Sequence, residues 1–177
     1  MTCTFRAPVA VVLFLSVATP GFAQQDVSDT RTDAQRLRLG AAAATEPIRL
    51  DGVLDEEVWQ TGDVARGFVQ AEPREGLAAS ERTEVRIAYD DRNLYVGAML
   101  YDTEVGALVV NDIKKDFAET AQDAFAVILD TYRDRRNGYV FMTNPEGAKA
   151  DWQVANAARE INTSWDAVWR VRTNRTP

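Results

Sequence analysis

Polar and apolar residues alternate with a period of two along much of the second half of the chain. Between residues 123 and 154, three such stretches follow one another, separated by the polar segments TYRDRRN and NPEG. This alternation, closed by Asn, Pro and Gly, is typical of strands joined by turns. The pattern therefore predicts three consecutive antiparallel strands. Nothing in it indicates the alternating strands and helices of a parallel sheet.

A second hairpin is predicted upstream, where residues 83–89 alternate, DDRN forms a turn, and residues 94–101 return as an apolar strand. Residues 106–113 fit either a strand or a helical turn. About eight short strands at regular spacing predict an all-β fold, an antiparallel β-sandwich of immunoglobulin-like or jelly-roll type. The shorter predicted strands cover residues 48–50, 65–70 and 165–173.

One short helix interrupts this pattern near Trp59. The segment EEVWQ follows Asp55, which is a favourable N-cap residue, and its two glutamates suit the positive end of a helix dipole. We expect Trp59 on the buried face of that helix. Residues 24–46 are polar without a sustained apolar period and predict a flexible linker, so the ordered domain is expected to cover residues 47–177.

The N-terminus has the features of a secretory signal peptide over residues 1–23. Arg6 precedes an apolar run, and small residues at Gly21 and Ala23 mark a cleavage site before Gln24. The run is shorter than the roughly 20 residues that span a bilayer, which favours a signal over an anchor. Cleavage would also remove the chain's single cysteine, Cys3, so export to the periplasm or cell envelope would bring no disulfide framework.

The composition restricts which partners, metal ions and catalytic groups the chain can use. The formal net charge is −7, and loss of Arg6 would lower it by one, so an acidic surface argues against nucleic acid as a partner. The chain has no histidine and no cysteine after Cys3, which removes the commonest general bases, thiol nucleophiles and transition-metal ligands. No nucleophile motif is present, so we expect no enzyme activity from this chain by itself.

Three strings point to a family. IRLDGVLDEEVWQ, ERTEVRIAYDDRNLYVG and QDAFAVILDTYRDRRNGYVFMTNPEGAKADWQ occur in that order, and together they resemble the family 9 carbohydrate-binding module found at the N-terminus of larger exported bacterial envelope proteins. The resemblance covers roughly residues 48–172. It implies a β-sandwich that binds oligo- or polysaccharide, bound calcium in some members, and linkage to a glycoside-hydrolase domain or another downstream region, which could be membrane-associated.

Two features depart from the family. Sugar-binding members carry an aromatic platform just before the strand that begins here at Asp123, whereas this chain has ETAQ at residues 119–122. Members also continue into another strand after the point that corresponds to Thr173, so the resemblance implies a closing strand beyond Pro177. The missing aromatic favours an alternative function, a structural or interaction domain that precedes a membrane-associated region and binds no sugar.

The remaining candidates for sugar contact are tryptophans, because their faces can stack on sugar rings while polar neighbours orient the hydroxyls. Trp152 and Trp165 are the predicted stacking residues, with Asp151 and Gln153 as polar neighbours. Because both tryptophans alternate with apolar residues, a core role is the simpler interpretation for each. Hard oxygen ligands in the TYRDRRN turn also make a calcium site conceivable, although three arginines in the turn would oppose it; its ligands would be Asp130, Asp134 and Asn137.

Overall fold

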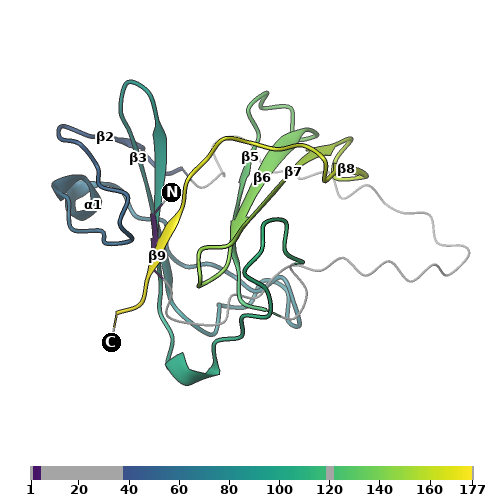
Figure 1. Ribbon diagram of the computed structural model, residues 1–177, viewed down its shortest axis with the longest axis horizontal. Helices are drawn as coiled ribbons and strands as arrows, with labels where there is room; N and C mark the ends of the chain where they lie inside the picture. The colour runs from purple at the N-terminus through teal and green to yellow at the C-terminus, as the bar shows by residue number, and fades with distance from the viewer. Residues whose placement is uncertain (1, 5–37, 119–121, 177) are drawn as a thin grey trace, which may run out of the picture.

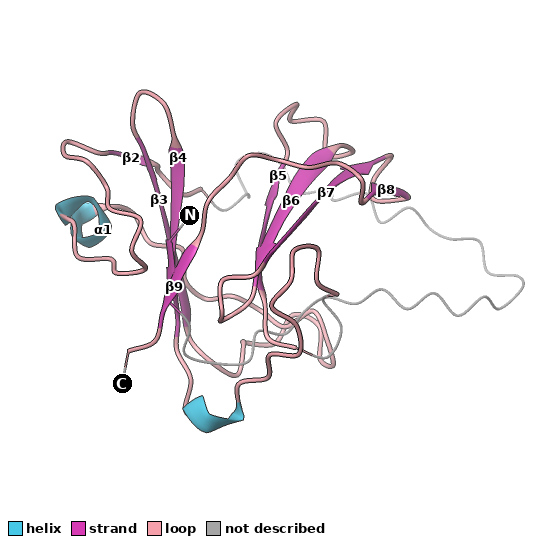
Figure 2. Ribbon diagram, in the orientation of Figure 1, coloured by secondary structure: helices cyan, strands magenta, loops and turns pink. Residues whose placement is uncertain are grey.

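The chain folds into two β-sheets with very little helix, which confirms the all-β prediction (Figure 1). The computed structural model describes residues 2–4, 38–118 and 122–176. The first sheet has the strand order β2-β3-β4-β1-β9 and the second β5-β6-β7-β8 (Figure 2). The strands are β1 (Thr2–Thr4), β2 (Ala42–Ala43), β3 (Thr83–Tyr89), β4 (Leu94–Leu100), β5 (Phe125–Leu129), β6 (Gly138–Thr143), β7 (Lys149–Ala155), β8 (Glu160–Asn162) and β9 (Arg172–Asn174).

The two predicted hairpin regions form the centres of the two sheets. β3 pairs with β4 as the predicted antiparallel hairpin, and the DDRN turn is held by Asp90, which accepts hydrogen bonds from the backbone N–H groups of Arg92 and Asn93, both at 2.7 Å. β5, β6 and β7 form the predicted antiparallel meander, to which β8 adds an edge strand. The first sheet also contains parallel pairs, which were not predicted: β1 with β4 and β9, and β2 with β3.

The two sheets contact each other through apolar side chains. Val96, Ala98 and Leu100 alternate along β4 and pack with Phe125 of β5, while Val127 packs against the edge of this cluster. Because residues of a strand alternate between faces, these positions define the inner face of each sheet. The contact agrees with two stacked layers; the immunoglobulin-like or jelly-roll type remains a prediction.

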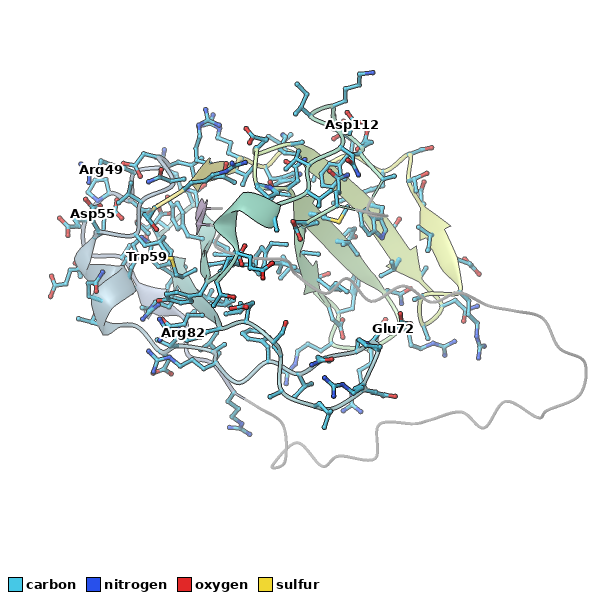
Figure 3. All side chains as sticks on the ribbon, turned by 90° about the horizontal axis from the view of Figure 1, so that it is seen from below. Arg49, Asp55, Trp59, Glu72, Arg82 and Asp112 are labelled. Atoms are coloured by element: carbon cyan, nitrogen blue, oxygen red, sulfur yellow. The ribbon has the colours of Figure 1, made fainter. Side chains whose placement is uncertain are left out.

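The outer face of the first sheet is covered by the predicted short helix, α1 (Glu57–Thr61). Its Trp59 is only 2% exposed and lies against Ala88 and Gly97. The indole N–H donates to Glu56 at 2.9 Å, and the other carboxylate oxygen of Glu56 accepts from the backbone N–H of Arg49 at 2.8 Å. Figure 3 shows Trp59 on this side of the molecule together with Arg49. The prediction of a buried Trp59 is confirmed.

Several boundary predictions were wrong for identifiable reasons. The N-cap position is Glu56, without a side-chain cap hydrogen bond, because Asp55 instead accepts from the Arg49 guanidinium at 2.8 Å. Residues 48–50 form no strand, and residues 65–70 contribute only isolated bridges at Ala65 and Val69. For residues 106–113, where a strand and a helical turn were both open, the structure has a single 3-10 turn at their start, η2 (Val105–Ala107), and no strand.

At the two ends of the chain, the sequence predicts a signal peptide, a linker and a final strand. Order begins before Pro47, because β2 lies within the predicted linker and the N–H of Ala44 donates to Tyr89 O at 2.8 Å; residues 24–37 of that linker lie outside the described residues. Residues 5–23 of the predicted signal peptide lie outside them as well, whereas Thr2–Thr4 form β1. Of the strand predicted over residues 165–173, only the end is a strand, β9.

Candidate functional site

Four aromatic side chains gather on the inner face of the second sheet. The ring of Trp165 lies 4.6 Å from that of Tyr139, centroid to centroid, with 33° between the planes. The rings of Trp165 and Trp169 both meet Phe141 edge-on, at 6.0 Å and 5.5 Å. These four residues are all partly buried. We call them the aromatic cluster, and they form the largest set of ring contacts among the described residues.

The cluster follows from the strand pattern and from one connecting segment. Tyr139 and Phe141 are two residues apart in β6, so both point to the same face. Residues 163–171 lead from β8 to β9 and cross from the second sheet to the first over the top of the molecule in Figure 1. We call this the crossing segment. Because it carries Trp165 and Trp169, it places both indoles over β6.

Asp151 holds the crossing segment in place. It is opposite Phe141 in the β6–β7 register, and its side chain is 0% exposed. One carboxylate oxygen accepts from the backbone N–H of Ala167 at 2.6 Å, between the two cluster tryptophans in sequence. The other oxygen lies 3.8 Å from Lys115 Nζ and has no hydrogen-bond partner among the described residues. A buried carboxylate needs such compensation, so this contact fixes the segment to β7.

Two lysines contact the crossing segment. Lys115 Nζ lies 3.0 Å from Asp116 and 3.2 Å from the exposed Asp166 of the crossing segment, and the hydrogen bonds to these two carboxylates raise the pKa of the lysine. Lys149 Nζ lies over the ring of Trp169 at 5.3 Å and donates to its backbone oxygen at 3.1 Å. Lys149 therefore contacts both the ring and the backbone of Trp169.

The cluster has an exposed rim near the turn between β5 and β6. Tyr132 in that turn is 68% exposed, and a hydrogen bond from the Tyr139 hydroxyl to Tyr132 raises the pKa of Tyr139. Gln153 is opposite Tyr139 in the β6–β7 register, so its amide lies on the same face of the sheet. Tyr132, Tyr139 and Trp165 thus present aromatic surface to solvent next to an amide. We call these three residues the aromatic rim.

The structure brings together three of the four predicted sugar-contact residues and separates the fourth. Trp165, Asp151 and Gln153 share the inner face of the second sheet. Trp152 is opposite Val140, on the other face, where it packs against the cluster that contains Met142 and Ala150. Sequence reasoning missed the aromatic rim residues of β6 and its turn. The signal was present, because the register set by the NPEG turn pairs Tyr139 with Gln153.

The proposed calcium ligands face the turn itself. The Asp130 carboxylate accepts from the backbone N–H groups of Asp134 and Arg135, at 3.2 Å and 2.8 Å. Asp134 accepts from the N–H groups of Arg136 and Asn137, at 2.8 Å and 2.9 Å, and these bonds lower its pKa. Among the residues that the structure describes, no group of three or more acidic, histidine or cysteine side chains is placed to hold a metal ion. The calcium site therefore gains no support from the geometry.

No family model, curated protein or solved structure matches the chain. In the segments that the structure describes, no helix has the length and apolar character needed to cross a bilayer.

Proposed function

We propose that this chain is an exported, non-catalytic module that binds oligo- or polysaccharide at the aromatic rim. The observation that carries the proposal is the position of Trp165, tilted over Tyr139 at 4.6 Å and only partly buried, while the exposed Tyr132 lies next to Tyr139. Flat aromatic faces of this kind suit the apolar C–H faces of pyranose rings. The resemblance of the motifs to the family 9 carbohydrate-binding module supports the same ligand class.

Polar groups around the rim supply the hydrogen-bonding capacity that sugar hydroxyls require. Gln153 offers an amide beside Tyr139, and Asp166 offers an exposed carboxylate one residue after Trp165. Asp151 has a different role in this proposal from the one expected from sequence. Because its side chain is buried and accepts from Ala167 N–H, it positions Trp165 through the crossing segment and does not contact the sugar.

Affinity electrophoresis through gels that contain individual polysaccharides tests the proposal. Trp165→Ala is expected to weaken binding at least tenfold, equivalent to about 1.4 kcal/mol, because it removes the stacking face. Trp152→Ala is the matched control, since it deletes the same side chain from the opposite face of the sheet. Far-UV circular dichroism of both variants checks that each remains folded.

Two results would count against sugar binding. One is the absence of retardation by any polysaccharide in a panel that includes cellulose derivatives, xylan, chitosan, glucans and mannans. The other is an equal loss of retardation in Trp165→Ala and Trp152→Ala, since the aromatic rim would then have no special role.

A second function, an interaction domain, is favoured by a separate observation in the first sheet. β9 is joined to β4 in that sheet through β1, which is part of the predicted signal peptide. A protein that loses this strand on export keeps two strands with unpaired edges. That arrangement suits a domain that binds another polypeptide.

A further inference from the structure

Three arginines converge on one buried carboxylate at the outer face of the first sheet. Glu84 of β3 has a side chain that is only 9% exposed. Arg66 Nε donates to its Oε1 at 2.9 Å, and Arg86 Nη1 donates to its Oε2 at 3.4 Å. Arg82 Nε lies 4.0 Å from Oε1, at the limit of an ion pair. We call Arg66, Arg82 and Arg86 the arginine cluster.

The strand pattern places these side chains on one face of the sheet. Glu84 and Arg86 are two residues apart in β3, so both point to the same side. Arg86 is opposite Gly97, the residue that Trp59 covers, which identifies this side as the outer face. Figure 3 shows Arg82 on the same side of the molecule as Trp59. The cluster is therefore separate from the aromatic rim, which belongs to the second sheet.

The arginine cluster has more positive charge than its carboxylate can balance. Each guanidinium carries one positive charge at neutral pH, so three of them around one carboxylate leave a surplus of about two. Among the described residues, no second carboxylate forms an ion pair with any of the three. The Nε of Arg86 is buried and has no hydrogen-bond acceptor among these residues. Since the chain has a formal net charge of −7, the cluster is a local positive site on an acidic protein.

Arg82 contributes least to the neutralisation of Glu84. The two closer arginines already donate to both carboxylate oxygens, whereas the Arg82 guanidinium lies over the ring of Tyr101, with its Cζ 3.6 Å from the ring centroid. The Arg82 side chain is 60% exposed. Because an aromatic ring contacts only the face of a stacked guanidinium, the N–H groups along its edge stay available to a further acceptor. Arg82 thus presents oriented donors to solvent.

We propose that the arginine cluster binds a doubly charged oxyanion, with Arg82 as its principal contact. The surplus of about two positive charges matches phosphate or sulfate better than a singly charged carboxylate. Planar guanidiniums suit these anions, because two parallel N–H groups can donate to two oxygens of the same anion. Inorganic phosphate and phosphate monoesters share this chemistry, and titrations with each distinguish the two sources.

Titration of the isotope-labelled full chain with sodium phosphate, followed through the arginine Nε–H NMR signals, tests this inference. At constant ionic strength, the signals of the arginine cluster are expected to shift along saturable curves, and acetate should bind at least tenfold more weakly. Arg82→Gln should weaken phosphate binding at least tenfold and leave the circular dichroism spectrum unchanged, because the other two arginines still donate to Glu84. Arg92→Gln is the matched control, since it removes the same charge from the exposed turn at the other end of β3.

Glu84→Gln separates an anion site from a purely structural ion-pair network. Loss of the central carboxylate raises the surplus to about three positive charges, so phosphate binding should tighten at least threefold. A cluster that serves only to neutralise Glu84 would bind no phosphate in any of these variants. Glucose 6-phosphate identifies the source of the anion: tighter binding than inorganic phosphate indicates a monoester, and equal or weaker binding indicates the free ion.

Three results would overturn the inference. Shifts that do not saturate in the wild type would show an adventitious ion only. Equal weakening by Arg82→Gln and Arg92→Gln would show a general effect of net charge, and weaker phosphate binding in a folded Glu84→Gln variant would contradict the charge argument. If Glu84→Gln does not fold, the comparison of the two arginine variants decides alone. Trp165→Ala, the test of sugar binding, should leave the phosphate titration unchanged, because that ring lies over the second sheet, so the two proposals fail independently.

Discussion

Gly97 of β4 provides a sharp test of how the outer face of the first sheet is packed. A Cβ at this position would lie 2.9 Å from Cζ3 and 3.0 Å from Cε3 of Trp59, and 3.1 Å from Cδ2 of Leu54. The indole has little room to move, because it is 2% exposed and its N–H donates to Glu56 at 2.9 Å. Gly97→Ala must therefore displace a buried ring or the strand itself.

Overpacking by one methyl group in a packed interior typically costs about 1–3 kcal/mol. For a domain of this size, the same loss lowers the melting temperature by roughly 2–12 °C. Gly106→Ala is the matched control, because a Cβ at Gly106 would have no neighbour within 4 Å. The control is expected to be neutral or slightly stabilising, since alanine restricts the unfolded chain more than glycine does. Urea unfolding followed by circular dichroism gives both free energies of unfolding.

A double-mutant cycle identifies the clashing atoms. Trp59→Phe removes the ring atoms nearest to the added Cβ, so Gly97→Ala should cost less in that background than in the wild type. Equal stability of Gly97→Ala and Gly106→Ala would refute the packing argument. A Gly97→Ala cost that is unchanged by Trp59→Phe would show that the indole is not the obstacle.

Three further predictions concern polar groups with defined partners. Glu56→Ala should destabilise by roughly 2–4 kcal/mol in urea, because it leaves the Trp59 indole N–H and a backbone N–H without their acceptor. The pKa of Asp90 is lowered to about 2, chiefly by the Tyr95 hydroxyl, so the ionised carboxylate stabilises the fold. Asp90→Asn should therefore lower the melting temperature at pH 7. The difference in melting temperature between variant and wild type should vanish as the pH falls from about 4 to 2. Asn144→Ala, which removes a fully buried amide whose oxygen accepts two backbone N–H groups, should cost roughly 2–4 kcal/mol by the same urea assay.

The hairpin strands were predictable because their local pattern and their environment agree. In β3, polar and apolar residues alternate, whereas β4 is apolar throughout, because one of its faces packs against the second sheet and the other is covered by Trp59. The turns at Asp90 and Asn144 have side chains that accept from nearby backbone N–H groups, which is the reason such residues mark turns. The positions of these strands and turns depend on neighbouring residues, so they can be predicted from the sequence.

The elements that were mispredicted depend on distant partners. Residues 165–171 alternate like a strand, yet the backbone N–H of Ala167 donates to the Asp151 side chain, 16 residues away. β1 and β2 are strands only because they pair with β3, β4 and β9. A sequence of two or three residues is too short to indicate a parallel partner strand. The same limit applied to the site, because the face on which Trp152 lies depends on the register of β6 with β7.

The crossing segment links the aromatic rim of the second sheet to the first sheet. Its first half places Trp165 against Tyr139, and its end leads through the buried Val171 into β9. Asp151 fixes its midpoint at Ala167. Because the anchor lies between the two ends, a displacement of β9 has to pass a buried charge-assisted hydrogen bond before it reaches Trp165. This geometry favours an aromatic rim whose position does not depend on movements of the first sheet.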